Sequence, residues 1–398
     1  MKKIISFLKA NWLIIAITII GLILRFWRLK FPQEVVFDET YYSKFAHDYL
    51  TGQPFFDVHP PFGKILIALG ELMFGYNSFG WRIIGAILGT LMLPLSYLVA
   101  LRIFKNKTVA ILTAALILFD GLFLVEARTG LLINSLTFFI LLSYYFVLTF
   151  IENKKLIYFI LGTISIGLAM SIQWLAAPFW LLLGIFLYWK KGLNWWRTLL
   201  FIFVPALVYA LTIFFDRHQS DYHSYFQYIV WWHQQALGYH VKLKDTHPYA
   251  SRWWTWLLMW RPVWFYSKTI DGRFFGIDGI GNPLIWWPAL AIFLSSIYDL
   301  FRNRKMKFVI PIASFALYYL LWAGISRTQF QYYIMLVLPF YFMILAYYWE
   351  KLFRAHKTAG YLYLIIIAIT FFAFYPILTA YPVSDHYWRS LMWFDSWI

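Results

Sequence analysis

The segment Arg82–Ile103 reads RIIGAILGTLMLPLSYLVALRI, and its only charged residues, Arg82 and Arg102, lie at or next to its ends. A helix needs about 20 mostly apolar residues to cross the roughly 30 Å hydrocarbon core of a bilayer. The length of this segment and the position of its charges therefore predict a transmembrane helix over 82–103.

Ten further segments have the same character. The whole chain of 398 residues is 62% hydrophobic and 13% charged, whereas soluble domains carry about 25% charged residues. This composition excludes a soluble globular protein and predicts an all-α polytopic membrane protein with about eleven transmembrane helices. The other expected spans are 7–29, 108–126, 129–151, 156–173, 174–189, 197–215, 281–301, 308–325, 329–349 and 359–379.

The N-terminal segment has an apolar run from Trp12 to Leu24 that could imitate a signal peptide. Arg25 and Arg28 follow the run, and no cleavage site of small residues is present. We therefore expect this segment to be retained as the first span.

The basic residues are distributed unequally between the two sides of the membrane. With the N-terminus placed in the cytoplasm, the loops on that side hold 18 of the 34 basic residues and 3 of the 18 acidic residues. Cytoplasmic loops of membrane proteins are enriched in lysine and arginine. This asymmetry predicts a cytoplasmic N-terminus and an extracytoplasmic C-terminus, and it explains the net charge of +16 without a nucleic-acid partner.

Two long segments, 30–81 and 216–280, face the predicted outer side, and the other connections are short. Loops of this length in compact proteins are usually functional or disordered, and these two are rich in aromatic residues and prolines. We expect both to form short amphipathic helices on the membrane surface. No internal repeat and no soluble domain interrupts the chain, so 1–398 is predicted to be a single transmembrane domain.

The first outer loop contains the densest group of reactive side chains. Asp38 and Glu39 are followed by Asp57, His59 and Lys64, and charged groups near a membrane are costly and usually functional. Because Asp38 and Glu39 are adjacent, only one of them can face a given reacting atom as a general base. Two alternatives remain open: the carboxylates form interfacial ion pairs, or His59 caps the helix that follows Pro60-Pro61.

Several basic residues are placed where they could bind a phosphate. Arg82 and Arg128 lie at the outer ends of the second and fourth spans, Arg327 precedes the tenth, and Lys64 follows the first-loop motif. A planar guanidinium matches phosphate oxygens with two hydrogen bonds. The alternative for each arginine is that it extends toward the lipid headgroups, and Glu126 could pair with Arg128.

The second outer loop carries clustered indoles with flanking polar groups. These comprise His247, the pair Trp253-Trp254 and Arg261. Such residues form either an aromatic belt at the membrane interface or a platform for sugar or peptide. Both interpretations fit the composition of this segment.

These motifs together resemble the protein O-mannosyltransferases, multispanning enzymes of the GT-C glycosyltransferase class. The resemblance rests on Phe37-Asp38-Glu39, on Phe56-Asp57-Val58-His59-Pro60-Pro61-Phe62-Gly63-Lys64 and on Arg82 in the first half. In the second half it rests on His247-Pro248-Tyr249 with Trp253-Trp254-Thr255-Trp256, on Arg261-Pro262 and on Gly281-Asn282-Pro283. It covers nearly the whole chain.

The resemblance implies an inverting transfer of mannose from a polyprenyl-phosphate-mannose lipid to Ser or Thr hydroxyls of secreted or membrane proteins. Asp38 would be the base and Glu39 its support, and the acceptor polypeptide would emerge from the secretion machinery. The chain has no β-trefoil insert, as in the bacterial members, which implies a bacterial plasma membrane. It departs from the family at Asn134, where an acidic residue is usual, and at Tyr332-Tyr333, where a histidine is common.

Two other functions fit parts of the sequence. A GT-C enzyme that moves another sugar to a lipid or glycan would need the same base and the same phosphate-binding groups. A secondary transporter would show paired repeats and broken helices near the midplane, whereas here the charges gather at the outer surface. The expected co-substrate is a lipid-linked sugar, and a divalent ion held by Asp38, Asp57 and His59 is a less favoured alternative.

Overall fold

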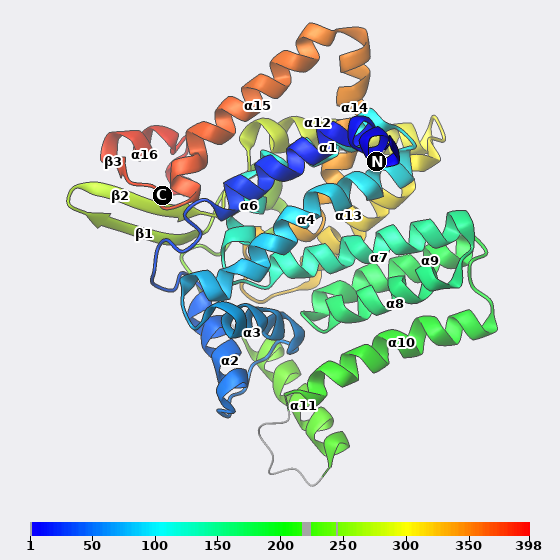
Figure 1. The fold of residues 1–398 in the computed structure, drawn as a ribbon, viewed down its shortest axis with the longest axis vertical. Helices are drawn as coiled ribbons and strands as arrows, with labels where there is room; N and C mark the ends of the chain where they lie inside the picture. The colour runs from blue at the N-terminus through cyan, green and yellow to red at the C-terminus, as the bar shows by residue number, and fades with distance from the viewer. Residues whose placement is uncertain (1, 217–223, 244–245) are drawn as a thin grey trace.

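The computed structural model describes residues 2–216, 224–243 and 246–398, and the described part is mainly helical (Figure 1). Its helices are α1 (Lys2–Phe26), α2 (Glu39–Thr51), α3 (Phe62–Phe74), α4 (Ser78–Phe104), α5 (Lys107–Leu118), α6 (Gly121–Arg128), α7 (Ile133–Asn153), α8 (Leu156–Met170), α9 (Ala177–Trp189), α10 (Trp195–Phe214), α11 (Tyr225–Lys242), α12 (Pro283–Phe301), α13 (Val309–Leu321), α14 (Leu338–Ala355), α15 (Lys357–Leu378) and α16 (Asp385–Leu391). Short 3-10 helices are η1 (Trp174–Ala176), η2 (Trp253–Leu258), η3 (Met306–Phe308), η4 (Trp322–Gly324), η5 (Gln331–Leu336) and η6 (Asp395–Trp397).

Each predicted apolar segment contains a helix, which confirms the helical membrane class. Within the described residues, seven helices are long and apolar enough to cross a membrane alone, and α5 with α6 makes an eighth if that bent pair is one span. The segments around α8 and α9 are shorter. The total of eleven spans therefore stays a prediction.

A break between α5 and α6 turns the chain by 63°. Asp120 sits at this break, and its carboxylate accepts hydrogen bonds from the backbone N–H groups of Phe123 and Asn282 and from the indole of Trp286. Asn282 in turn donates to the carbonyl oxygens of Phe119 and Ile367. These bonds satisfy the backbone groups that a broken helix exposes within the membrane.

The first long loop, residues 30–81, contains two short helices, α2 and α3. Helix α3 packs against both α2 and α4. The contact between α3 and α4 depends on glycine, because a Cβ atom on Gly70 would lie 2.3 Å from the carbonyl oxygen of Gly80. Asn77 caps α4 by accepting from the N–H groups of Phe79 and Gly80.

The second outer loop differs from the expectation of helices alone. It contains the 18-residue helix α11 and an antiparallel hairpin of β1 (Trp264–Ile270) and β2 (Arg273–Asp278), which β3 (Val383–Ser384) joins to give the order β1-β2-β3. Asp271 and Gly272 have φ values of 49° and 71°, the positive values required for a two-residue hairpin turn. Residues 217–223 and 244–245 of this loop lie outside the described residues.

Candidate active site

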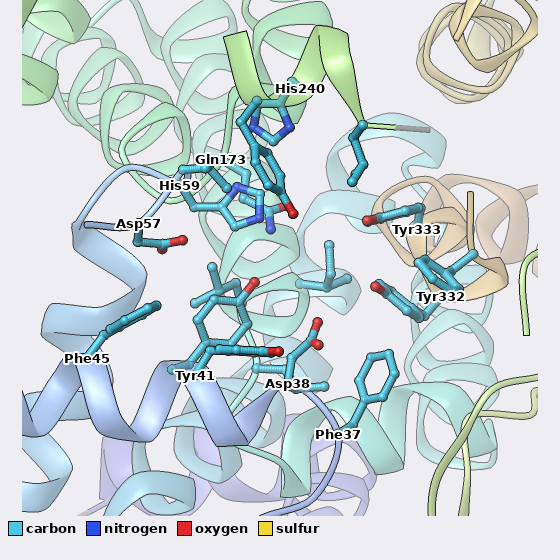
Figure 2. A pocket seen from close by; sticks show the side chains of 18 of the residues that line it. Phe37, Asp38, Tyr41, Phe45, Asp57, His59, Gln173, His240, Tyr332 and Tyr333 are labelled. Atoms are coloured by element: carbon cyan, nitrogen blue, oxygen red, sulfur yellow. The ribbon is translucent and has the colours of Figure 1, made fainter. Parts of the chain in front are cut away.

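A cavity of about 460 Å³ opens between the first outer loop and the segments that precede α7 and α14 (Figure 2). Figure 2 shows Asp38 and Tyr332 on one side of this space and His59, Gln173 and His240 on the other. The lining residues are Phe37, Asp38, Tyr41, Tyr42, Phe45, Phe56, Asp57, Val58, His59, Glu126, Leu131, Leu132, Ile133, Gln173, Tyr239, His240, Leu243, Arg327, Phe330, Tyr332 and Tyr333.

Asp38 is the residue immediately before α2, and its side chain points into the cavity (Figure 2). The carboxylate makes no hydrogen bond with the residues that the structure describes. Burial, with a smaller contribution from the charge of Asp57, raises the pKa of Asp38 to about 6. At neutral pH the carboxylate is therefore ionised, poorly solvated and available to accept a proton.

Phe37 fixes the direction in which Asp38 leaves the backbone. Its φ is 48°, a value that bulky residues rarely adopt. The Phe37 ring stacks on Phe265 of β1 with 4.9 Å between centroids and meets the edge of Tyr332 at 5.9 Å. The hairpin of the second loop thus holds the strained residue next to Asp38.

Glu39 has a different environment from its neighbour. Its carboxylate is buried and accepts hydrogen bonds from Nε and Nη2 of Arg82 at 2.8 and 2.7 Å, and from the backbone N–H groups of Val36 and Gly130. All its oxygens are therefore occupied by the protein. Glu39 is suited to hold the first loop against α4 and the segment before α7, whereas Asp38 is free to react.

Asp57 and Lys64 form a second buried pair at the cavity. The Lys64 Nζ lies 2.5 Å from a carboxylate oxygen of Asp57 and also donates to the carbonyl oxygen of His59. Although burial opposes ionisation, the charge of Lys64 and its hydrogen bond hold the pKa of Asp57 below its usual value. Burial lowers the pKa of His59 to about 4, so this imidazole is neutral at pH 7.

Arg327 brings a positive charge to the opposite side of the cavity. Its Nη1 donates to Nδ1 of His240 at 2.7 Å, and its Nε is buried with no partner among the described residues. Within the part of the chain that the structure describes, no other lysine or arginine lines this cavity. Arg327 and His240 also border an adjoining cavity of about 450 Å³. Its walls are mostly apolar and are formed by Trp174, Leu175, Leu237, Val241, Trp322 and Ile325.

Two family profiles match the chain along almost its whole length. The profile described as dolichyl-phosphate-mannose-protein mannosyltransferase matches residues 15–78 and 71–241. A second, described as the C-terminal four-transmembrane region of protein O-mannosyltransferase, matches residues 225–397. The chain belongs to the protein O-mannosyltransferase family.

Curated relatives agree with this assignment. A polyprenol-phosphate-mannose–protein mannosyltransferase of Corynebacterium glutamicum is 28% identical, over 85% of this chain and 81% of the relative. The protein of the same name from Mycobacterium tuberculosis is 25% identical, over 97% of this chain and 92% of its own length.

Solved structures share the fold. The S. cerevisiae protein O-mannosyltransferase Pmt1-Pmt2 complex bound to the sugar donor matches with a TM-score of 0.87 at 14% identity, covering 98% of this chain and 93% of the matched chain. ArnT from Cupriavidus metallidurans in the apo state matches with a TM-score of 0.63 at 15% identity, covering 91% and 64%. This mannosyltransferase-family chain therefore has the GT-C glycosyltransferase fold.

Three of the residues expected to contact a donor phosphate have other partners in this family member. All N–H groups of Arg82 are used by Glu39 and by the carbonyl oxygens of Leu29, Pro32 and Glu34. Arg128 Nη1 donates to carbonyl oxygens at the end of α1, those of Leu24, Arg25 and Trp27, a favourable place for a cation. Lys64 is paired with Asp57, so the structure leaves Arg327 as the cation that faces the cavity.

The predicted residues of the second loop lie outside the cavity. His247 is exposed and meets the lining ring of Phe330 edge-on at 5.1 Å, and Trp254 is 57% exposed. Trp253 packs on Tyr319, while Arg261 donates to the carbonyl oxygens of Pro248 and Ser396. None of the four lines the cavity, and His247 adjoins it through the ring of Phe330.

Sequence reasoning missed several lining residues that carry polar groups, among them Glu126, Gln173, His240 and Tyr333. A pair between Glu126 and Arg128 was one alternative, but residues two apart on a helix do not face each other. His240 has no local motif to mark it, and it reaches the cavity because α11 folds back over the first loop. Among the described residues, no three His, Asp or Glu side chains are grouped to hold a metal ion, and Asp57, one of the expected ligands, is paired with Lys64.

Proposed function

We propose that this protein is an inverting glycosyltransferase that moves mannose from a polyprenyl-phosphate-mannose donor to a Ser or Thr hydroxyl of a polypeptide. The observation that carries the proposal is the arrangement of the cavity. An unpaired carboxylate, Asp38, faces it from one side and a guanidinium, Arg327, lines it as well. The family membership and the names of the curated relatives support the sugar and the acceptor.

The reaction follows from these two groups. Asp38 accepts the proton of the acceptor hydroxyl, and the oxygen of that hydroxyl forms a bond to the anomeric carbon of mannose. The bond between that carbon and the phosphate oxygen breaks, and its electron pair leaves with polyprenyl phosphate. Attack from the face opposite the leaving phosphate inverts the sugar. Placing both reactants in one cavity removes most of the entropic cost of bringing them together.

Arg327 is the residue that we assign to the donor phosphate. The charge on the leaving oxygen increases in the transition state, and a guanidinium already in place stabilises it. The apolar walls of the adjoining cavity suit the first isoprene units of the lipid, with Trp174, Leu237 and Trp322 among its lining residues. In this assignment Arg82 and Arg128 support the loop and α1 instead.

The remaining predicted residues receive supporting roles. Glu39 anchors the loop that presents Asp38, and the Asp57–Lys64 pair fixes the turn that aims His59 into the cavity. We propose that His247, Trp253, Trp254 and Arg261 form a surface on which the acceptor polypeptide lies. The exposed indole of Trp254 and the imidazole of His247, which contacts the lining ring of Phe330, support this role, since flat aromatic groups can cover extended chains.

We further propose that the protein lies in a bacterial plasma membrane, with a cytoplasmic N-terminus and the Asp38 cavity outside. The distribution of basic residues supports this orientation. Because the chain has no cysteine, single cysteines can report it. A maleimide that does not cross membranes should label Gln53→Cys in intact cells and Lys155→Cys only after permeabilisation. The reverse pattern would overturn the orientation.

Transfer itself is tested with membranes supplied with labelled polyprenyl-phosphate-mannose and a Ser/Thr-rich peptide. The proposal expects labelled glycopeptide. Label that appears only in lipid or glycan would instead favour a GT-C transferase with a different acceptor. Accumulation of intact donor across the membrane without transfer would favour a transporter.

A further inference from the structure

Two buried acceptor groups that line the cavity have no partner in the described residues. Both carboxylate oxygens of Glu126 and the side-chain oxygen of Gln173 lack a hydrogen bond. Glu126 is 0% exposed and Gln173 is 5% exposed. Glu126 comes from α6, just after the break at Asp120, and Gln173 comes from the connection between α8 and α9.

Leaving such groups unpaired is costly. A buried acceptor without a partner loses its hydrogen bonds to water and gains none from the protein. The nearest cations along the chain and in the loop are already committed, since Arg128 bonds to the end of α1 and Lys64 bonds to Asp57. Nothing in the described fold accounts for the cost of Glu126.

A ligand with several hydroxyl donors would satisfy these oxygens. The parts of the proposed donor differ in this respect: the prenyl chain is apolar, and the phosphate oxygens are acceptors that have no hydroxyl group to donate. The acceptor serine or threonine has one hydroxyl, and that proton is assigned to Asp38. Only the hexose ring carries several neighbouring hydroxyl groups.

We propose that Glu126, together with Gln173, binds hydroxyl groups of the donor sugar. This inference rests on the proposed function and adds the residues that recognise the sugar itself. Arg327 holds the phosphate, and Glu126 holds the ring, so the anomeric carbon between them is presented to Asp38. Glu126 is in this account a substrate-binding residue that distinguishes a glycosylated carrier from a bare one.

The test is equilibrium binding of two lipids to the purified full chain in nanodiscs: polyprenyl-phosphate-mannose and polyprenyl phosphate. Glu126→Met keeps the side-chain volume and removes the acceptors. It should weaken binding of the sugar-bearing lipid roughly tenfold, the loss expected for one or two hydrogen bonds. Binding of polyprenyl phosphate should stay as in wild type.

Glu71→Met is the matched control. Glu71 is also a buried carboxyl whose oxygens have no hydrogen-bond partner among the described residues, but it lies on α3 and lines neither cavity. This variant should bind both lipids as wild type does. Glu126→Met should also melt at or above the wild-type temperature, because it removes an unpaired buried carboxyl.

Three outcomes would overturn the inference. Equal affinity of Glu126→Met and wild type for the mannose-bearing lipid would remove Glu126 from sugar binding. An equal loss for both lipids, with a lower melting temperature, would assign Glu126 to packing. A wild-type protein that transfers no mannose would overturn the proposed function, and this inference with it. A wild-type protein that transfers mannose, together with unchanged lipid binding by Glu126→Met, would overturn this inference alone.

Discussion

Glu39 and Arg82 form a buried ion pair in which the carboxylate Oε2 lies 2.7 Å from Nη2, although 43 residues separate them in the chain. The pair joins the first outer loop to α4. It also separates the functions of two adjacent carboxylates, because Glu39 is fully bonded while Asp38 faces the cavity. Because the ion pair with Arg82 occupies Glu39, only Asp38 of this Asp-Glu dipeptide can act on a substrate.

Breaking this pair should destabilise the protein. Arg82→Met or Glu39→Gln leaves a charge or polar group buried without its partner, which typically costs about 3 to 5 kcal/mol. Thermal unfolding of the purified variants measures the loss. Arg389→Ala breaks an exposed pair with Asp385 on α16 and should leave the melting temperature unchanged. If Arg82→Met melts like wild type, the pair does not hold the loop.

Replacing the base should separate activity from folding. Asp38→Asn keeps the shape of the side chain but cannot accept the proton, so we expect mannose transfer to fall by a factor of 10² or more, a typical contribution of general base catalysis. Donor binding should persist. Because burial raises the pKa of Asp38, the ionised form costs stability above pH 6, and the asparagine variant should melt no lower than wild type at pH 7. Retained turnover would remove Asp38 from the role.

The pH dependence of the reaction should report the same group. With a pKa of about 6, Asp38 loses its ability to accept a proton as the pH falls below 6, and kcat/KM should decline about tenfold per pH unit there. The charge of Asp57 contributes to the raised pKa. Asp57→Asn should therefore lower the pKa of Asp38 and extend activity to lower pH. An acidic limb that Asp57→Asn leaves in place, or moves to higher pH, would assign the limb to another group.

Arg327 should matter for the lipid phosphate. Arg327→Ala removes a charge-assisted hydrogen bond worth about 1.5 to 3 kcal/mol, so the KM for the donor should rise roughly 10- to 100-fold. The KM of Arg327→Lys for the donor should lie between the values of wild type and Arg327→Ala, because lysine keeps the charge but cannot make two parallel hydrogen bonds to the phosphate. Arg389→Ala again serves as the control. Unchanged donor affinity in Arg327→Ala would leave the phosphate without its proposed partner.

Much of this fold could be predicted from the sequence, since transmembrane helices depend on the local density of apolar residues. The helices α4, α7 and α15 coincide closely with their apolar windows. The β1-β2 hairpin was missed although Asp271-Gly272 is a strong turn signal, because the whole second loop was expected to form short amphipathic helices. Local patterns favour both interpretations, and the packing of Phe265 on Phe37 favours the hairpin.

The site was harder to predict than the fold. The first-loop motif pointed to Asp38, Asp57 and His59, and these three residues line one cavity. Arginines at span ends were expected to face the donor. Whether such an arginine points to lipid, to a carboxylate or to a cavity depends on which residues, distant in the sequence, the fold brings next to it. Arg82 meets carbonyl groups of the first loop, and only the tertiary fold brings Arg327 to His240.

The most direct test of the central claim is the structure of this protein with polyprenyl-phosphate-mannose bound. The account predicts the phosphate within hydrogen-bond distance of Arg327 and the anomeric carbon in the cavity that Asp38 faces. A phosphate bound at Arg82 or Arg128, or a sugar outside the reach of Asp38, would contradict it.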